Sequence, residues 1–184
     1  MGKHQFSIRV FCILMNGIID KIVFLDIDHV LTNTDIDNTS FWSYDPSQYR
    51  LSKVNLANLD KVLDTTGASI VIASNWRKFK KPYTTWHFEG KWYESPLEPF
   101  KEMYGSRIID MLPIEHCLTK CECLELWFED NPWFSKHGHY VILEDDLREG
   151  YQKHLVYSKH LVLTDYHFGL TEADAEKAIS ILNR

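Results

Sequence analysis

Two aspartates lie two residues apart at the end of an apolar run, and this spacing is the first sign of chemistry in the chain. The run 22–25 is followed by Asp26, and Asp28 comes two residues later. Carboxylates this close repel each other when both are ionised, unless a cation lies between them. Carboxylate oxygens are also among the ligands that Mg²⁺ prefers. The pair therefore predicts a divalent-metal site.

Other polar side chains follow later apolar runs or begin a predicted helix. The carboxyl ends of parallel strands meet at one edge of an α/β sheet, and ligands bind there. We therefore expect one pocket that combines two acidic groups, a hydroxyl and a lysine. Besides the first pair, its members are Ser74, Lys120, Glu144, Asp145 and Asp146.

Apolar runs and amphipathic segments alternate along the chain. This order predicts a doubly wound (Rossmann-like) α/β fold, with a parallel sheet of about five strands and helices on both faces. Ser52 and Gly67 have the types expected at the two ends of a helix, and Thr119 and Thr171 each begin a capping-box pattern. The predicted strands cover 21–27, 68–74, 107–112, 140–143 and 160–164. The predicted helices cover 53–66 and 99–104, run from 119 through 128, and begin again at 171.

Length and charge limit the classes of function. The chain has 184 residues, which suits one domain with a full core. Its formal charge of −6 gives no general attraction to nucleic acid or to an anionic membrane. We expect no membrane association, and no obligate protein partner is evident.

The four cysteines indicate free thiols in a reducing, cytoplasmic compartment. A zinc site in 116–123 is the weaker interpretation, because the spacing of Cys117, Cys121 and Cys123 matches no common zinc motif.

The predicted catalytic domain covers residues 20–184 and includes one insertion. Residues 1–19 form an N-terminal extension that we expect outside the fold, and the apolar run within it is too short to span a bilayer. An aromatic-rich insertion covers about 78–97 and predicts a short hairpin or loop near the active end, with no large cap domain. Its rings either pack on one another or stack a nucleobase.

The fragment Asp26-Ile27-Asp28-His29-Val30-Leu31-Thr32 resembles the first motif of the haloacid-dehalogenase (HAD) superfamily. The order of acid pair, hydroxyl, lysine and second acid group is also the order of that superfamily. Ser74-Asn75-Trp76-Arg77 and Asp165-x3-Gly169-Leu170-Thr171 are similar to a small, minimally capped group related to RNA-repair-associated phosphatase domains. The resemblance covers roughly residues 20–182.

This resemblance implies a catalytic role for four residues. Asp26 is expected to attack phosphorus and form an aspartyl-phosphate, while Asp28 protonates the leaving oxygen and later activates water. Ser74 is expected to hold a phosphoryl oxygen, and Lys120 to neutralise charge. The other cations considered for the role of Lys120 are Arg77, Lys101 and Lys136.

The resemblance also implies Mg²⁺ as cofactor and a set of binding residues. The expected metal ligands are Asp26, Asp145 and the backbone carbonyl of Asp28, with Glu144 and Asp146 as further candidates. Asn75, Arg77 and His29 are the candidate substrate-binding residues. His29 stands where relatives often have glycine, so it either contacts substrate or covers the loop.

Asp28 favours phosphate chemistry over dehalogenation, which needs no acid at that position. The predicted function is an Mg²⁺-dependent phosphomonoester hydrolase acting on a nucleotide, another small phosphomonoester or a nucleic-acid end. The alternative is a catalytically silent binding module that holds a partner through the aromatic insertion. A two-component receiver domain is excluded, because too few residues follow Asp146 to supply its remaining strands.

Overall fold

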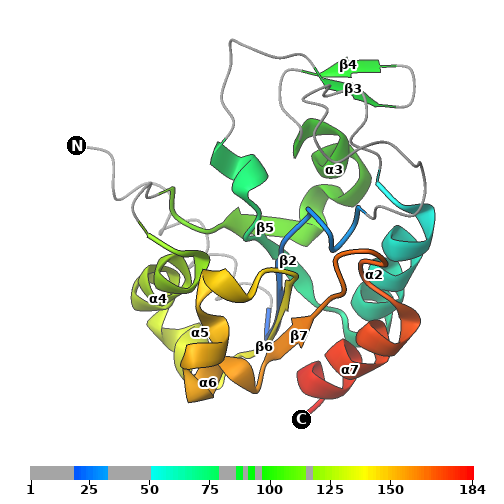
Figure 1. Ribbon diagram of the computed structural model, residues 1–184. Coiled ribbons are helices and arrows are strands. Elements are labelled where there is room, and N and C mark those ends of the chain that lie inside the picture. The colour runs from blue at the N-terminus through cyan, green and yellow to red at the C-terminus, as the bar shows by residue number, and fades with distance from the viewer. Residues whose placement is uncertain (1–18, 33–50, 79–85, 89–90, 94–96, 115–117) are drawn as a thin grey trace.

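A five-stranded parallel sheet in the order β5-β2-β1-β6-β7 forms the centre of the protein (Figure 1). The structure is a computed structural model that describes residues 19–32, 51–78, 86–88, 91–93, 97–114 and 118–184. The predicted α/β fold is confirmed. The strands of the sheet are β1 (Lys21–Leu25), β2 (Ser69–Ile72), β5 (Ile108–Met111), β6 (His139–Glu144) and β7 (Leu161–Leu163).

Helices cover both faces of this sheet, as expected. Figure 1 shows α2 and α7 side by side on one side, and α4 and α5 on the other. The helices are α2 (Lys53–Thr66), α3 (Leu97–Tyr104), α4 (Lys120–Asp130), α5 (Pro132–His137), α6 (Leu155–Ser158) and α7 (Glu172–Leu182). Short 3-10 turns are η2 (Asn75–Lys78), η3 (Gly105–Arg107), η4 (Leu147–Glu149) and η5 (Tyr151–Lys153). The sequence did not predict α5 and α6, because helices of one or two turns are too short to show an apolar period.

The central strand β1 is buried on both faces, which explains its uninterrupted apolar run. Side chains alternate across a strand. Val23 and Leu25 therefore pack in the hydrophobic cluster that contains α2, α3 and α7. Ile22 and Phe24 pack in the opposite cluster, with α4 and α5.

Capping residues define the ends of three helices, and one of these caps sets the position of Lys120. The Ser52 side chain caps α2, and Gly67 ends that helix with a left-handed φ of 70°. Capping boxes open α4 at Thr119 and α7 at Thr171, as predicted. Because Thr119 is the N-cap of α4, Lys120 is the first residue of that helix and lies at its N-terminal end.

The strand order places a topological switch beside β1. The chain moves from β1 through β2 to β5 on one side, and then returns to β6 and β7 on the other. In register, Leu25 lies beside Ile72 of β2 and Leu143 of β6. The residues that follow these three strands therefore share one edge, which is where open α/β sheets bind ligands.

Several expectations concern residues that the structure describes only in part. Of the N-terminal extension, only Ile19 is described, and it packs against the α4 side of the core. Within the insertion, β3 (Trp86–Phe88) and β4 (Lys91–Tyr93) pair as an antiparallel hairpin, in line with the predicted hairpin. The stacking role proposed for the insertion's aromatic side chains lies outside the described residues.

Cys121 and Cys123 are free and buried, which fits ordinary thiols. Cys12 and Cys117 lie outside the described residues, and so does His116. Across the described ranges, no helix has both the length and the apolar character needed to cross a bilayer.

Candidate functional site

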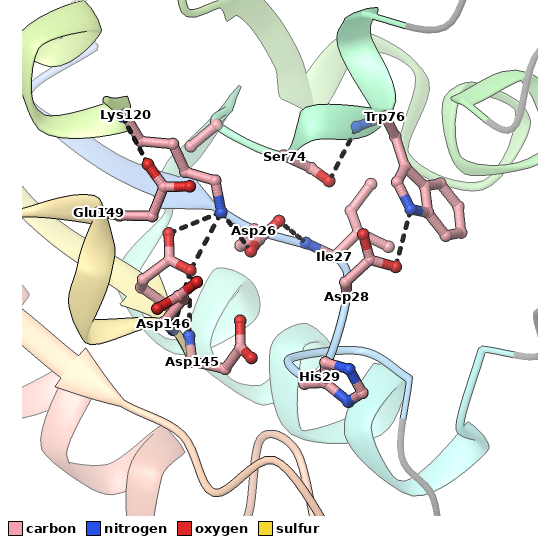
Figure 2. A network of polar contacts seen from close by, with 12 residues as sticks. Asp26, Ile27, Asp28, His29, Ser74, Trp76, Lys120, Asp145, Asp146 and Glu149 are labelled. Carbon is pink, nitrogen blue, oxygen red and sulfur yellow. Dashed lines mark hydrogen bonds and ion pairs between the residues drawn. The ribbon is translucent and has the colours of Figure 1, made fainter. Parts of the chain in front are cut away.

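Asp26 and Lys120 meet in a buried ion pair at the carboxyl edge of the sheet (Figure 2). Asp26 directly follows β1, and its backbone N–H donates to the Leu143 carbonyl over 3.0 Å. The Lys120 Nζ donates to Asp26 Oδ2 over 2.5 Å, and the Ile27 N–H donates to Oδ1 over 2.7 Å. Both carboxylate oxygens therefore have a donor that fixes the orientation of the group, and Asp26 is only 2% exposed.

Glu144, the last residue of β6, completes a buried triad with these two residues. Lys120 Nζ lies 3.0 and 2.9 Å from its two carboxylate oxygens. Burial lowers the pKa of Lys120, but the charges of Asp26 and Glu144 outweigh burial and leave that pKa raised. Burial, followed by the charge of Asp26, holds the pKa of Glu144 well above its usual range. Two carboxylates and one ammonium leave one negative charge in excess, which a proton or a cation can neutralise.

Asp145 extends the triad into a group of metal-ligand type. Carboxylate oxygens of Asp26, Glu144 and Asp145 all lie within 4.8 Å of one another. Burial, followed by the Asp26 charge, raises the pKa of Asp145, as expected where carboxylates lie close together. Because all the possible ligand atoms are oxygens and the group carries excess negative charge, it fits a hard divalent cation such as Mg²⁺.

Glu144 and Asp146 have other bonds that limit their part in such a site. Glu144 Oε1 accepts the backbone N–H groups of Asp145 and Asp146, each over 3.2 Å, in addition to the bond from Lys120. The Asp146 carboxylate accepts from the Arg148 guanidinium at 2.8 Å, and this hydrogen bond lowers its pKa. Both residues lie at the predicted edge, but these contacts occupy acceptor positions that a metal would need.

Asp28 is held by Trp76, a residue that no sequence motif assigns to the site. Trp76 Nε1 donates to Asp28 Oδ1 over 2.8 Å (Figure 2). Burial, followed by the charges of Asp26 and Asp145, raises the pKa of Asp28 to about 7, although Trp76 and Lys120 act in the opposite direction. A carboxyl with a pKa near neutrality can both donate and accept a proton at pH 7.

Ser74 and Asn75 lie in the turn after β2, next to the end of β1. Ser74 is fully buried, its N–H donates to the Leu25 carbonyl over 3.1 Å, and its Oγ accepts the Trp76 N–H over 3.2 Å. The Oδ1 atom of Asn75 is buried and has no hydrogen-bond partner in the described part of the chain. A buried acceptor without a partner at a site edge is suited to a donor group on a ligand.

Arg77 binds backbone carbonyls in the same region. Its guanidinium donates to the carbonyls of Ala73 and Ser74, and more weakly to that of Pro113 at 3.5 Å. These contacts tie the turn that carries Ser74 to the segment after β5. The sequence predicted that Arg77 binds substrate. These contacts instead favour a role for Arg77 in holding the turn.

The structure separates Lys120 from the other lysines considered for its role. Lys101 on α3 and Lys136 on α5 are both exposed, whereas Lys120 is only 3% exposed. One further residue that the sequence did not single out is Glu149, whose carboxylate accepts the Lys120 backbone N–H over 2.7 Å. No sequence pattern marks Glu149, because it lies in the short turn η4 and reaches α4 only in the folded chain.

His29 lies at the rim of the site with a left-handed φ of 51°. Its N–H donates to Thr32 Oγ1 over 2.8 Å, and its carbonyl accepts from Thr164 Oγ1 over 3.0 Å. Its Nδ1 lies 3.2 Å from the Tyr166 carbonyl. The ring is therefore fixed between the loop after β1 and the turn after β7.

Comparison with known proteins agrees with this geometry. Residues 22–175 match the family described as the HAD domain in Swiss Army Knife RNA repair proteins. No curated protein and no solved structure matches the chain.

Proposed function

Because the chain belongs to the family of HAD domains of Swiss Army Knife RNA repair proteins, we propose that it is an Mg²⁺-dependent phosphomonoester hydrolase. The observation that carries the proposal is the buried contact of Lys120 with Asp26 and Glu144, next to an acid whose pKa lies near 7. Phosphoryl transfer depends mainly on positioning and charge stabilisation, and this group offers both.

In the proposed reaction, Asp26 attacks the phosphorus atom and forms an aspartyl-phosphate. The hydrogen bonds to its two oxygens hold the carboxylate in place before the attack. Lys120 neutralises charge on the carboxylate and on the phosphoryl oxygens. Ser74 Oγ donates its O–H to one of those oxygens, while it accepts the Trp76 N–H, which fixes its position.

Asp28 moves the proton in both half-reactions. It gives its proton to the leaving oxygen as the phosphorus–oxygen bond breaks, and the substrate alcohol departs. The ionised Asp28 then takes a proton from water, which attacks the aspartyl-phosphate and releases inorganic phosphate. Trp76 keeps the carboxyl group oriented through its bond to Oδ1.

Asp26, Asp145 and the backbone carbonyl of Asp28 would hold Mg²⁺, with Glu144 and Asp146 close by. When bound, Mg²⁺ would neutralise charge on the phosphoryl group and on the crowded carboxylates. The proposal rests on the close approach of the carboxylate oxygens and on their excess negative charge.

The proposed substrate is a nucleotide or the phosphorylated end of a nucleic acid. The RNA-repair context of the family supports this choice over other small phosphomonoesters. The Asn75 Oδ1 atom, which has no hydrogen-bond partner among the described residues, adds an acceptor for a ribose hydroxyl.

Removal of divalent metal tests the proposed function directly. We expect phosphate release from a nucleoside monophosphate to fall about 10²-fold or more in EDTA, because charge stabilisation by the metal is worth several kcal/mol. Excess Mg²⁺ should restore the rate. Absence of phosphate release from mononucleotides, sugar phosphates and phosphorylated oligonucleotides in Mg²⁺ would instead favour a silent binding module.

The pH dependence of the reaction should report the proton on Asp28. The acid must be protonated to expel a poor leaving group, so the rate with an alkyl phosphate should fall about tenfold per pH unit above the pKa. That limb is expected near pH 7 or somewhat below, because a bound cation lowers the pKa of a neighbouring carboxyl.

An aryl phosphate provides the control for this pH profile. Its leaving group departs without a proton, so its rate for phosphoenzyme formation should depend much less on pH in the same range. Asp28→Asn should abolish the alkaline limb for the alkyl phosphate. An identical limb for both substrates in the wild type would assign the titration to another group.

A further inference from the structure

Three consecutive aromatic side chains follow β7, and the first of them, Tyr166, contacts His29 at the rim of the site. Tyr166 is 41% exposed, Phe168 is 56% exposed, and His167 between them is exposed as well. Together with His29 they form a row of neighbouring rings. The centroid distances are 4.8 Å for His29–Tyr166, 4.3 Å for Tyr166–His167 and 6.4 Å for His167–Phe168.

The turn that carries these rings is fixed against the loop that carries Asp28. Leu170 N–H donates to the Val30 carbonyl over 2.8 Å, and the Thr164 hydroxyl donates to the His29 carbonyl. Gly169 has a φ of 65°, and a Cβ there would lie 2.8 Å from the Val30 carbonyl oxygen. Only glycine permits this close approach, so the sequence and the hydrogen bonds hold the aromatic turn in one position.

The row begins beside the acidic group. His29 follows Asp28 directly, and Figure 2 shows it close to Asp28 and Asp145. Its positive φ is uncommon for a residue with a side chain, and such strain persists where surrounding contacts fix it. The same turn provides those contacts, so the strained residue and the exposed rings form one structural unit.

We propose that the aromatic turn Tyr166–Phe168 is a stacking surface for the nucleobase of the nucleotide whose phosphate is attacked by Asp26. This inference rests on the proposed function and names the part of the substrate that the turn would bind. Stacking of a base on an aromatic ring contributes about 1–3 kcal/mol and tolerates all four bases. It needs no positive charge, which suits a chain with a formal charge of −6.

The charge of the chain also limits how much of a nucleic acid would be bound. An acidic protein gains little from a long polyphosphate backbone. The surface is therefore assigned to the single nucleotide that carries the phosphate, whether this nucleotide is free or at the end of an oligonucleotide.

Paired substrates that differ only in the base test this assignment. Wild-type protein should hydrolyse a nucleoside monophosphate with a kcat/KM about 5- to 150-fold above that of ribose phosphorylated at the same position. Phe168→Ala should remove most of this difference through KM for the nucleotide, and should leave the ribose phosphate unchanged. Phe168→Trp should retain the preference, because an indole ring also stacks.

Trp133→Ala is the matched control, since Trp133 is 41% exposed and lies on α5. It should leave kcat/KM for both substrates unchanged.

An oligonucleotide with a terminal phosphate, compared with the same oligonucleotide that lacks the terminal base, distinguishes a nucleic-acid end from a free nucleotide. If Phe168→Ala removes the preference for the base with only one of these two substrate types, that type is the one whose base stacks on the aromatic turn.

A binding measurement separates this inference from the proposed function. Calorimetric titration of Asp26→Asn protein with the nucleotide and with ribose phosphate should show tighter binding of the nucleotide, and Phe168→Ala in that background should remove the difference. If wild-type protein hydrolyses neither of these compounds nor the phosphorylated oligonucleotide, the proposed function fails, while the titration still decides the stacking surface. Equal affinities for the two compounds, or a nucleotide affinity unchanged by Phe168→Ala, would overturn the inference.

Discussion

Replacing Asp26 with Asn is expected to lower kcat/KM for a phosphomonoester by about 10⁴-fold or more, which is the scale found when a nucleophile is removed. The amide has nearly the shape of the carboxylate, but its oxygen is too weak a nucleophile to form the acyl-phosphate bond. Lys120 keeps its bonds to Glu144 in this variant, so the fold should persist. Phosphate release in Mg²⁺ measures the effect.

The covalent intermediate gives a second readout of the same residue. Acid-quenched wild-type protein should carry one phosphoryl group by intact-protein mass spectrometry, and the Asp26→Asn variant should carry none. Asp64→Asn is the control, because Asp64 is an exposed partner of Arg107 on the surface. Phosphate release by Asp26→Asn at the wild-type rate would assign the nucleophile elsewhere.

Replacing Lys120 with Met is expected to reduce the free energy of unfolding by about 3–5 kcal/mol at pH 8, because it leaves two buried carboxylates without their cation. Asp26 is 2% and Glu144 is 1% exposed, so water cannot replace the ammonium group. Activity should fall steeply as well, since the charge that balances the phosphoryl group is lost. Urea unfolding measures the stability, and phosphate release measures the activity.

The stability deficit of Lys120→Met should depend on pH in a definite direction. The raised pKa of Glu144 rises further without the lysine, and an acid with a raised pKa in the folded state costs stability as pH increases. The deficit should therefore be largest at pH 8 and should shrink toward pH 5, as the carboxyl groups take up protons. Adding Glu144→Gln should recover part of it at pH 8.

A surface lysine provides the comparison. Lys61 Nζ also contacts two carboxylates, those of Glu172 at 3.1 Å and Glu176 at 2.5 Å, but its side chain is 38% exposed. Lys61→Met should leave the midpoint of urea unfolding nearly unchanged, since exposed ion pairs contribute little to stability. A loss of similar size in both lysine variants would mean that burial of the triad is not what makes Lys120 important.

Most of the fold was predictable because its signals are local. The continuously apolar run before Asp26 marks a buried central strand, and the boundaries of α2 follow from Ser52 and Gly67. The capping box at Thr119 likewise fixes the start of α4, and with it the position of Lys120. Each of these signals depends on neighbouring residues only, so tertiary structure was not needed to read it.

The sequence could not reveal the groups that assist these residues. Trp76 reaches Asp28 across 48 positions, and Glu149 reaches the backbone of Lys120 across 29. No periodic pattern connects such distant positions. Arg77 shows the same limit, because a cation next to a site can bind either substrate or backbone, and only its position at the carbonyls of Ala73 and Ser74 separates the two.

The sequence by itself determined which side chains stand at the ends of β1, β2 and β6, because hydrophobic runs and caps set those ends. Tertiary structure decided how these side chains meet. It placed β1 between β2 and β6, which buried Lys120 against two carboxylates and raised the pKa of Asp28 to about 7. It also brought the turn after β7 to His29, 137 residues away from Tyr166 along the chain. The physical reason is that burial, charge and ring contacts depend on distance in space, which the order of strands in the sheet sets.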